Sequence, residues 1–132
     1  MGEAHIDAVL EAVHFAVVGA SDDFSKYGAK VFACYSQAGR TATPVNPRVT
    51  TVQGVPTVAS LRDLPDPAPS VSIITPPSVT EQVVEDAAAA GARILWMQPG
   101  AESPAAISRA QELGLEVIAG GPCLLVVLGY RE

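Results

Sequence analysis

Features that define several protein classes are scarce in this sequence. Two cysteines and two histidines in 132 residues provide no disulfide framework and no zinc-finger spacing. No apolar run approaches the roughly 18 residues that span a bilayer. Residues 1–13 lack the basic start and continuous apolar stretch of a secretory signal. We therefore expect a reduced, cytoplasmic protein that has no membrane segment.

Positive charge is also scarce. Eight Lys and Arg against 14 Asp and Glu give a formal net charge of −6. That charge excludes bulk electrostatic attraction to nucleic acid or to an anionic membrane, although it allows a local basic pocket for a small anion. With 48% hydrophobic and 17% charged residues, the chain can bury a substantial core. Its length predicts one domain.

Apolar runs typical of buried strands alternate with amphipathic stretches typical of helices. Ser78 and Glu81 have the spacing of a capping box at the start of one of these helices. Strands separated by helices imply parallel pairing with right-handed crossovers. We therefore predict a doubly wound α/β domain over residues 14–132, with a parallel sheet of about five strands, preceded by an N-terminal helix within 1–13. The predicted strands are 14–20, 40–45, 71–75, 94–98 and 115–119; the predicted helices are 3–13, 29–38, 78–90 and 103–113, with a helical turn at 60–64.

Ligands of open parallel sheets bind at the carboxyl ends of the strands, where the strand order reverses. The segments that follow the predicted strands are short and rich in Gly and Pro. Gly19-Ala20-Ser21 is typical of a phosphate cradle, in which amides at a helix N-terminus face an anion, and Lys26 lies nearby. The alternative is an ordinary strand-to-helix turn.

The sequence lacks the features of a nicotinamide dinucleotide site. The first strand is followed by GASDDFSKYG, which does not contain the fingerprint G-x-G-x-x-G. The second strand leads into Val45-Asn46-Pro47-Arg48, which supplies no acid for a ribose hydroxyl. An Arg at this place suits a phosphorylated ribose, or it is a solvated surface residue.

No catalytic constellation is evident in the sequence. His5 and His14 do not follow strands, as a catalytic triad would need. Asp22 and Asp23 are expected to be turn caps or solvated loop charges. Cys123, after Gly-Gly-Pro, is either a thiol facing the crevice or an inert small side chain.

The order of several short motifs resembles the stand-alone CoA-binding domain family, whose members are similar to the N-terminal domain of the succinyl-CoA synthetase α subunit. These motifs are FAVVGAS, PVNP, GVPTV, ITPP, AGARILWMQPG and GGPC, and the resemblance runs from His14 to Leu128. It implies a Rossmann-type domain that holds coenzyme A or an acyl-CoA at the carboxyl ends of its strands. The residues implied as ligand contacts are Gly19, Ala20, Ser21, Lys26, Val45, Asn46, Pro47, Arg48, Thr75, Pro76, Pro77, Met97 and Gln98.

The resemblance also bounds the expected activity. Many relatives differ at Pro99, and we expect no counterpart here of the synthetase's second domain, which supplies its phosphorylated histidine. We therefore expect a binding protein for a small molecule, with no catalytic residues of its own and no metal. Two alternatives remain open: an NAD(P)-binding enzyme or regulator of the same fold, and an interaction protein with a vestigial pocket.

Overall fold

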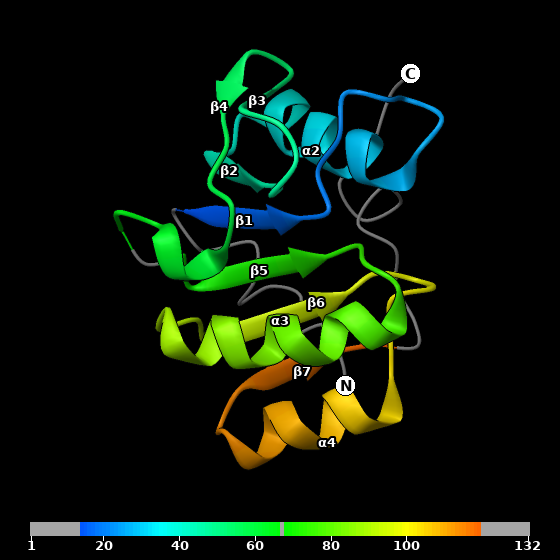
Figure 1. The fold of residues 1–132 in the computed structure, drawn as a ribbon, viewed down its shortest axis with the longest axis vertical. Coiled ribbons are helices and arrows are strands. Elements are labelled where there is room, and N and C mark those ends of the chain that lie inside the picture. Colours follow the sequence, from blue (N-terminus) through cyan, green and yellow to red (C-terminus); the bar gives the residue numbers. More distant parts are fainter. Residues whose placement is uncertain (1–13, 67, 120–132) are drawn as a thin grey trace.

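The computed structural model describes residues 14–66 and 68–119 (Figure 1). The predicted N-terminal helix and Cys123 lie outside the described residues. The observed elements, in chain order, are β1 (Phe15–Val18), α2 (Tyr27–Gln37), β2 (Ala42–Val45), β3 (Thr51–Val52), β4 (Val55–Pro56), the 3-10 helix η1 (Leu61–Asp63), β5 (Ser70–Ile73), α3 (Pro77–Ala89), β6 (Ile94–Met97), α4 (Pro104–Glu112) and β7 (Glu116–Ile118).

Five strands form one parallel sheet in the order β2-β1-β5-β6-β7. This arrangement confirms the predicted α/β fold. Strand β1 lies between β2 and β5 and pairs with both, so that Val18 lies beside Val45 on one flank and beside Ile73 on the other. The chain winds outward from β1 to β2 and then crosses back to β5. The winding direction therefore reverses between β1 and β5, which is the topological switch point.

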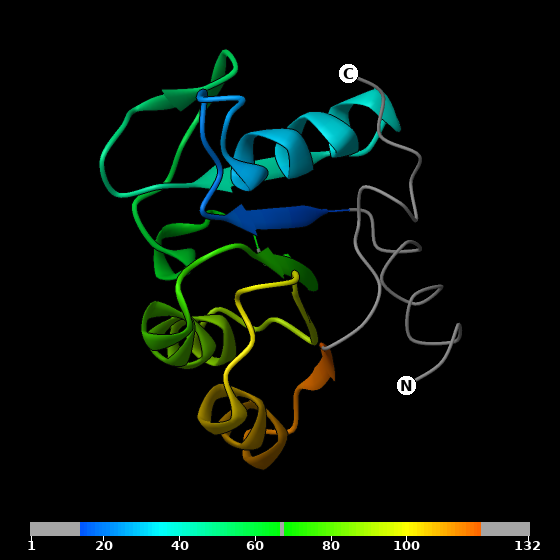
Figure 2. The ribbon, with the colours of Figure 1, turned by 90° about the vertical axis from the view of Figure 1, so that its right-hand side faces the viewer.

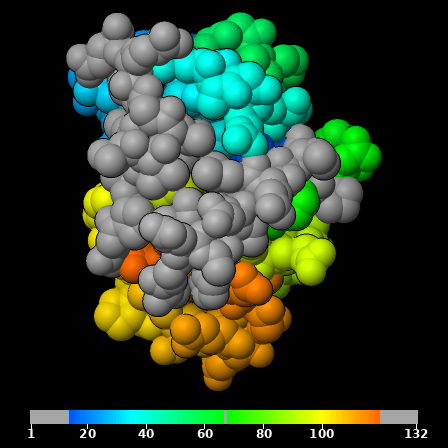
Figure 3. Space-filling model, turned by 180° about the vertical axis from the view of Figure 1, so that it is seen from behind, coloured from blue at the N-terminus to red at the C-terminus, as the bar shows by residue number. Residues whose placement is uncertain are grey.

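Side chains that alternate along the strands build two separate cores. Ala16 and Val18 join a cluster with α3 and α4, whereas Phe15 and Val17 join a cluster with α2. Accordingly, α3 and α4 cover one face of the sheet and α2 covers the other (Figure 2). Seen from behind, α2 lies at one end of the molecule and α4 at the opposite end (Figure 3). Cys34 is buried in α2, as expected.

The connection from β2 to β5 contains an antiparallel hairpin, β3–β4, that was not predicted from the sequence. Its strands have only two residues each, too few for a periodic signal. Val52 is fully buried in the core on the α2 side, which anchors the hairpin. The segment that follows bonds to β2: the Asn46 N–H donates to the Val58 carbonyl, and the Val58 N–H donates to Pro44. The predicted helical turn is present as η1.

The predicted capping box at α3 is wrong. The N-cap of α3 is Pro76, and no side chain caps the helix in the described part of the chain. Pro77 takes the first helical position, where its fixed φ suits the helix, and this places Ser78 inside the first turn. The Glu81 carboxylate instead accepts a hydrogen bond of 3.0 Å from the hydroxyl of Ser103, the N-cap residue of α4.

Two glycines allow three segments of backbone to meet at the end of β1. Gly19 has a φ of +96°, and a Cβ there would overlap the Ile74 carbonyl oxygen. A Cβ on Gly28, in the first turn of α2, would overlap the Gly19 carbonyl oxygen. The close approach of α2 to the end of β1 therefore requires glycine at position 28.

Gly28→Ala tests this requirement, because helix propensity and packing predict opposite signs. Alanine favours a helix by roughly 1 kcal/mol over glycine, but the overlap with Gly19 should destabilise the fold by about 3 kcal/mol. Urea denaturation measures the difference. Gly114→Ala is the matched control: an added Cβ has open space there and only the φ of +81° is strained, so a loss of about 1 kcal/mol is expected. A Gly28→Ala variant as stable as the wild type would contradict the argument.

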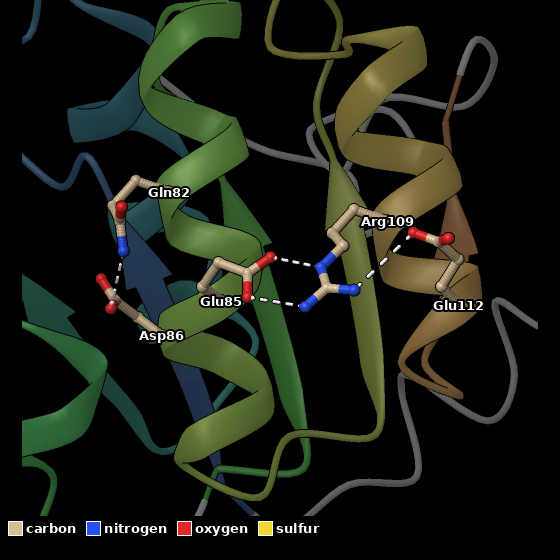
Figure 4. A network of polar contacts seen from close by, with 5 residues as sticks. All are labelled: Gln82, Glu85, Asp86, Arg109 and Glu112. Atoms are coloured by element: carbon tan, nitrogen blue, oxygen red, sulfur yellow. Dashed lines mark hydrogen bonds and ion pairs between the residues drawn. The ribbon is translucent and has the colours of Figure 1, made fainter.

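Charged side chains join α3 to its neighbours on both sides, and Figure 4 shows the side that faces α4. The Arg109 Nε of α4 lies 2.7 Å from a Glu85 oxygen, and its Nη2 makes a second bond at 3.2 Å. On the other side of α3, the Arg62 Nε lies 2.7 Å from the Asp86 Oδ1. The hydrogen bonds from Arg109 lower the pKa of Glu85, and they raise the pKa of Arg109.

The lowered pKa of Glu85 predicts a pH dependence of stability. The pair with Arg109 stabilises the folded state above the ordinary glutamate pKa of 4.5, and this contribution is lost as the pH falls through the lowered value. Glu85→Gln should lower the urea midpoint slightly at neutral pH and leave it unchanged at about pH 2. Asp66→Asn, in an exposed loop, is the control. A deficit that persisted at low pH would show that the ion pair is not its source.

Candidate functional site

A cavity of about 640 Å³ opens at the carboxyl ends of β1, β2 and β5, at the switch point of the sheet. Its walls come from the loops that follow these three strands, from the segment that leads into η1, and from one face of α3. The residues that line it are Val18, Gly19, Ala20, Ser21, Lys26, Val45, Asn46, Pro47, Arg48, Ala59, Ser60, Leu61, Ile74, Thr75, Pro76, Val79, Gln82, Val83 and Asp86.

The fold brings most of the predicted site residues together around this cavity. Ten of the thirteen line it: Gly19, Ala20, Ser21, Lys26, Val45, Asn46, Pro47, Arg48, Thr75 and Pro76. The other three are not among its lining residues. Pro77 starts α3, and Met97 and Gln98 are buried at the end of β6. A direct role for these three in ligand contact stays a prediction.

Two hydrogen bonds link the loop after β1 to the loop after β2, so the two loops form one continuous wall. The Gly19 N–H donates to the Val45 carbonyl at 3.2 Å. The Asn46 Nδ2 donates to the Ala20 carbonyl at 2.9 Å, and its Oδ1 accepts from the Arg48 N–H at 2.8 Å. A single asparagine side chain therefore fixes both loops at the mouth of the cavity.

The loop between β1 and α2 is folded by its own side chains. The Ser21 Oγ accepts from the Asp23 N–H, and the Asp23 Oδ1 accepts from both the N–H and the hydroxyl of Ser25. The hydrogen bond from the Ser25 hydroxyl is the largest cause of the lowered pKa of Asp23. Asp23 is thus a turn cap, one of the two roles that the sequence allowed. The Ser21 oxygen acts as the acceptor here, which leaves its proton to be donated to a ligand.

A phosphate cradle at Gly19 would need a helix that starts directly after this residue, but α2 starts further along the chain. It starts at Tyr27, after Lys26 as its N-cap residue, and no side chain caps it in the described segments. Lys26 also lines the cavity. The start of α2 therefore combines amide donors with a cationic side chain, a combination that favours an anion.

Charge is unevenly distributed around the cavity. Lys26 and Arg48 come from the loops after β1 and β2, whereas Asp86 on α3 is the acidic residue of the lining and is paired with Arg62. Thr75 is oriented by the buried Thr80, since their hydroxyl oxygens lie 2.7 Å apart.

The contribution of α3 to the cavity wall was not predicted from the sequence. Val79, Gln82, Val83 and Asp86 occupy positions i, i+3, i+4 and i+7 and so share one helix face. This spacing was visible in the sequence. Because core-facing residues show the same periodicity, the spacing alone did not identify a cavity wall.

For the described residues, no helix is long and apolar enough to cross a membrane. Within the same ranges, no group of three or more His, Cys, Asp or Glu side chains is placed to hold a metal ion.

Comparison with known proteins identifies related sequences and folds. A protein-family model described as a CoA binding domain matches residues 13–129. A protein of Bacillus subtilis (strain 168), described as uncharacterized protein YneT, is 29% identical over 117 residues, which are 88% of this chain and 87% of the relative.

Solved structures show the same fold. A hypothetical protein from Pyrococcus horikoshii OT3 has a TM-score of 0.88 and 28% identity, over 94% of this chain and 87% of that chain. A conserved hypothetical protein from Pyrococcus furiosus has a TM-score of 0.81 and 34% identity, over 86% and 97%. The dinucleotide forming acetyl-coenzyme A synthetase 1 of Ca. Korarchaeum cryptofilum, in complex with phosphate and ADP, has a TM-score of 0.74 and 26% identity, over 81% of this chain and 25% of the synthetase. Since the family match spans nearly all of the sequence, the chain belongs to the family of CoA-binding domains.

Proposed function

We propose that this protein binds coenzyme A or an acyl-CoA in the cavity at the carboxyl ends of β1, β2 and β5, and that it does so without chemistry of its own. One observation carries the proposal: in a chain of the CoA-binding domain family, ten of the thirteen predicted contact residues line a single cavity at the switch point of the sheet. Open α/β sheets bind nucleotides at this place.

The chemistry of the lining matches the two halves of the ligand. The pyrophosphate binds near Ser21 and Lys26, which line the cavity just before the start of α2. Arg48, which lines the cavity, would supply a guanidinium that pairs with the ribose phosphate. The neutral pantetheine arm follows apolar or small walls such as those of Ile74 and Pro76.

The lining also supports a binding role rather than a catalytic one. It holds no histidine and no cysteine among the described residues, and so it offers no nucleophile paired with an imidazole base. Its carboxylate, Asp86, is held by Arg62 at 2.7 Å. The acetyl-coenzyme A synthetase that shares the fold is about three times as long, since 81% of this chain matches 25% of it.

Isothermal titration calorimetry with CoA tests the proposal, and Arg48→Glu tests the placement of the ligand. We expect saturable binding by the wild type and a loss of about tenfold or more in affinity for Arg48→Glu, because a cation facing a phosphate becomes an anion. The loss should shrink with 3′-dephospho-CoA, which lacks the ribose phosphate. Arg93→Glu makes the same charge change at the amino end of β6 and should bind CoA normally. An absence of binding at millimolar CoA would refute the proposal.

A thermal-shift panel separates CoA from the nicotinamide alternative. A ligand that binds only the folded state raises the melting temperature by an amount that grows with the ratio of its concentration to its Kd. We expect CoA and acetyl-CoA to raise the melting temperature more than NAD, NADP or ADP at equal concentration. A larger shift with NADP would favour the nicotinamide alternative, because Arg48 would suit its ribose phosphate equally well.

A further inference from the structure

Gln53 adopts a backbone conformation that glutamine rarely takes. Its φ is +51°, the only positive value at a non-glycine residue among the described residues. With Gly54, at a φ of +81°, it forms the two-residue turn that joins β3 to β4. Turns of this type ordinarily take Asn or Gly at the first position. A left-handed residue with a Cβ is strained by roughly 1 kcal/mol, so the surrounding contacts must compensate.

The contacts of Gln53 are directed at one segment, the loop between β1 and α2 with the first turn of α2. Its backbone N–H donates to the Asp22 Oδ1 at 2.5 Å. Its Nε2 donates to the Ser21 carbonyl at 3.2 Å and to the Ala29 carbonyl at 2.9 Å. The Gln53 side chain therefore links the loop to α2, although Gln53 belongs to neither segment.

The same loop is also held by Asn46, whose side chain donates to the Ala20 carbonyl. The positions of two cavity-lining groups, the Ser21 hydroxyl and the Lys26 side chain, depend on the path of the backbone between these two anchors. A loop that is already ordered loses little conformational entropy when a ligand binds, and this improves affinity.

We propose that Gln53 is a positioning residue for the ligand site: the hairpin turn holds the loop of residues 20–26 in the shape that receives the phosphates. The inference rests on the proposed function. Gln53 does not line the cavity, so it acts through the loop and not through contact with the ligand. By linkage, a ligand that requires the ordered loop must also stabilise the contacts of Gln53.

Gln53→Gly is the most informative variant. Glycine accepts the left-handed backbone without strain and keeps the N–H that bonds to Asp22, but it removes both side-chain bonds. We expect the Kd for CoA to rise about tenfold, as measured by calorimetry. Gln53→Glu keeps the length of the side chain but presents an oxygen to two carbonyl oxygens, so it should weaken binding further. Glu85→Gln, which removes a surface ion pair outside the lining, should leave the Kd unchanged.

Amide hydrogen exchange without ligand provides the second measurement. The amides of residues 21–26 should exchange faster in Gln53→Gly than in the wild type, while those of β5 and β6 remain protected. In the wild type, CoA should slow exchange at the turn as well as in the loop. A role confined to stability would leave the turn unaffected by CoA.

The outcomes separate this inference from the proposed function. If the wild type binds CoA and Gln53→Gly binds it equally well, the positioning role is refuted and the proposed function stands. If the wild type fails to bind CoA, the proposed function is refuted. In that case, amide hydrogen exchange of residues 21–26 without ligand still tests whether Gln53 orders the loop. Equal exchange rates in Gln53→Gly and the wild type would overturn this role.

Discussion

The close approach of three backbone segments at the end of β1 is the constraint on which the site depends. Gly19 lies against the Ile74 carbonyl on one side and accepts the close approach of Gly28 on the other, and its N–H bonds to Val45 at the end of β2. No side chain fits between these segments. The ends of β1, β2 and β5 and the start of α2 are therefore drawn to one point, where amides and small residues define a cavity that admits a ligand.

The unusual connection from β2 to β5 explains why the cavity exists. A doubly wound fold ordinarily covers each face of its sheet with helices. Here the chain between these strands forms the β3–β4 hairpin and the short helix η1. Val52 of the hairpin packs into the core on the α2 side, whereas Leu61 of η1 packs into the core on the α3 side. The connection thus reaches both faces around the edge of β2, and space remains between η1 and α3.

Periodicity and strand-end chemistry predicted most of the architecture. Every predicted strand and helix within the described residues is present, with ends displaced by at most two residues. The errors have local causes. Pro77 begins α3 one position before the expected capping residue, and strands of two residues around Gln53 are too short to produce a pattern. The hydrophobic pattern itself holds in the hairpin, because the apolar residue Val52 is fully buried there.

By itself, the sequence determined that five apolar strands alternate with helices, and that Gly19, Lys26 and Arg48 follow strands. Parallel topology then placed these residues at one edge, because the carboxyl ends of parallel strands coincide. Only the tertiary structure decided which face of α3 turns towards that edge, and that Gln53 reaches Ser21 across the chain. These facts depend on the packing of distant segments, and such contacts leave no spacing in the sequence from which they can be derived.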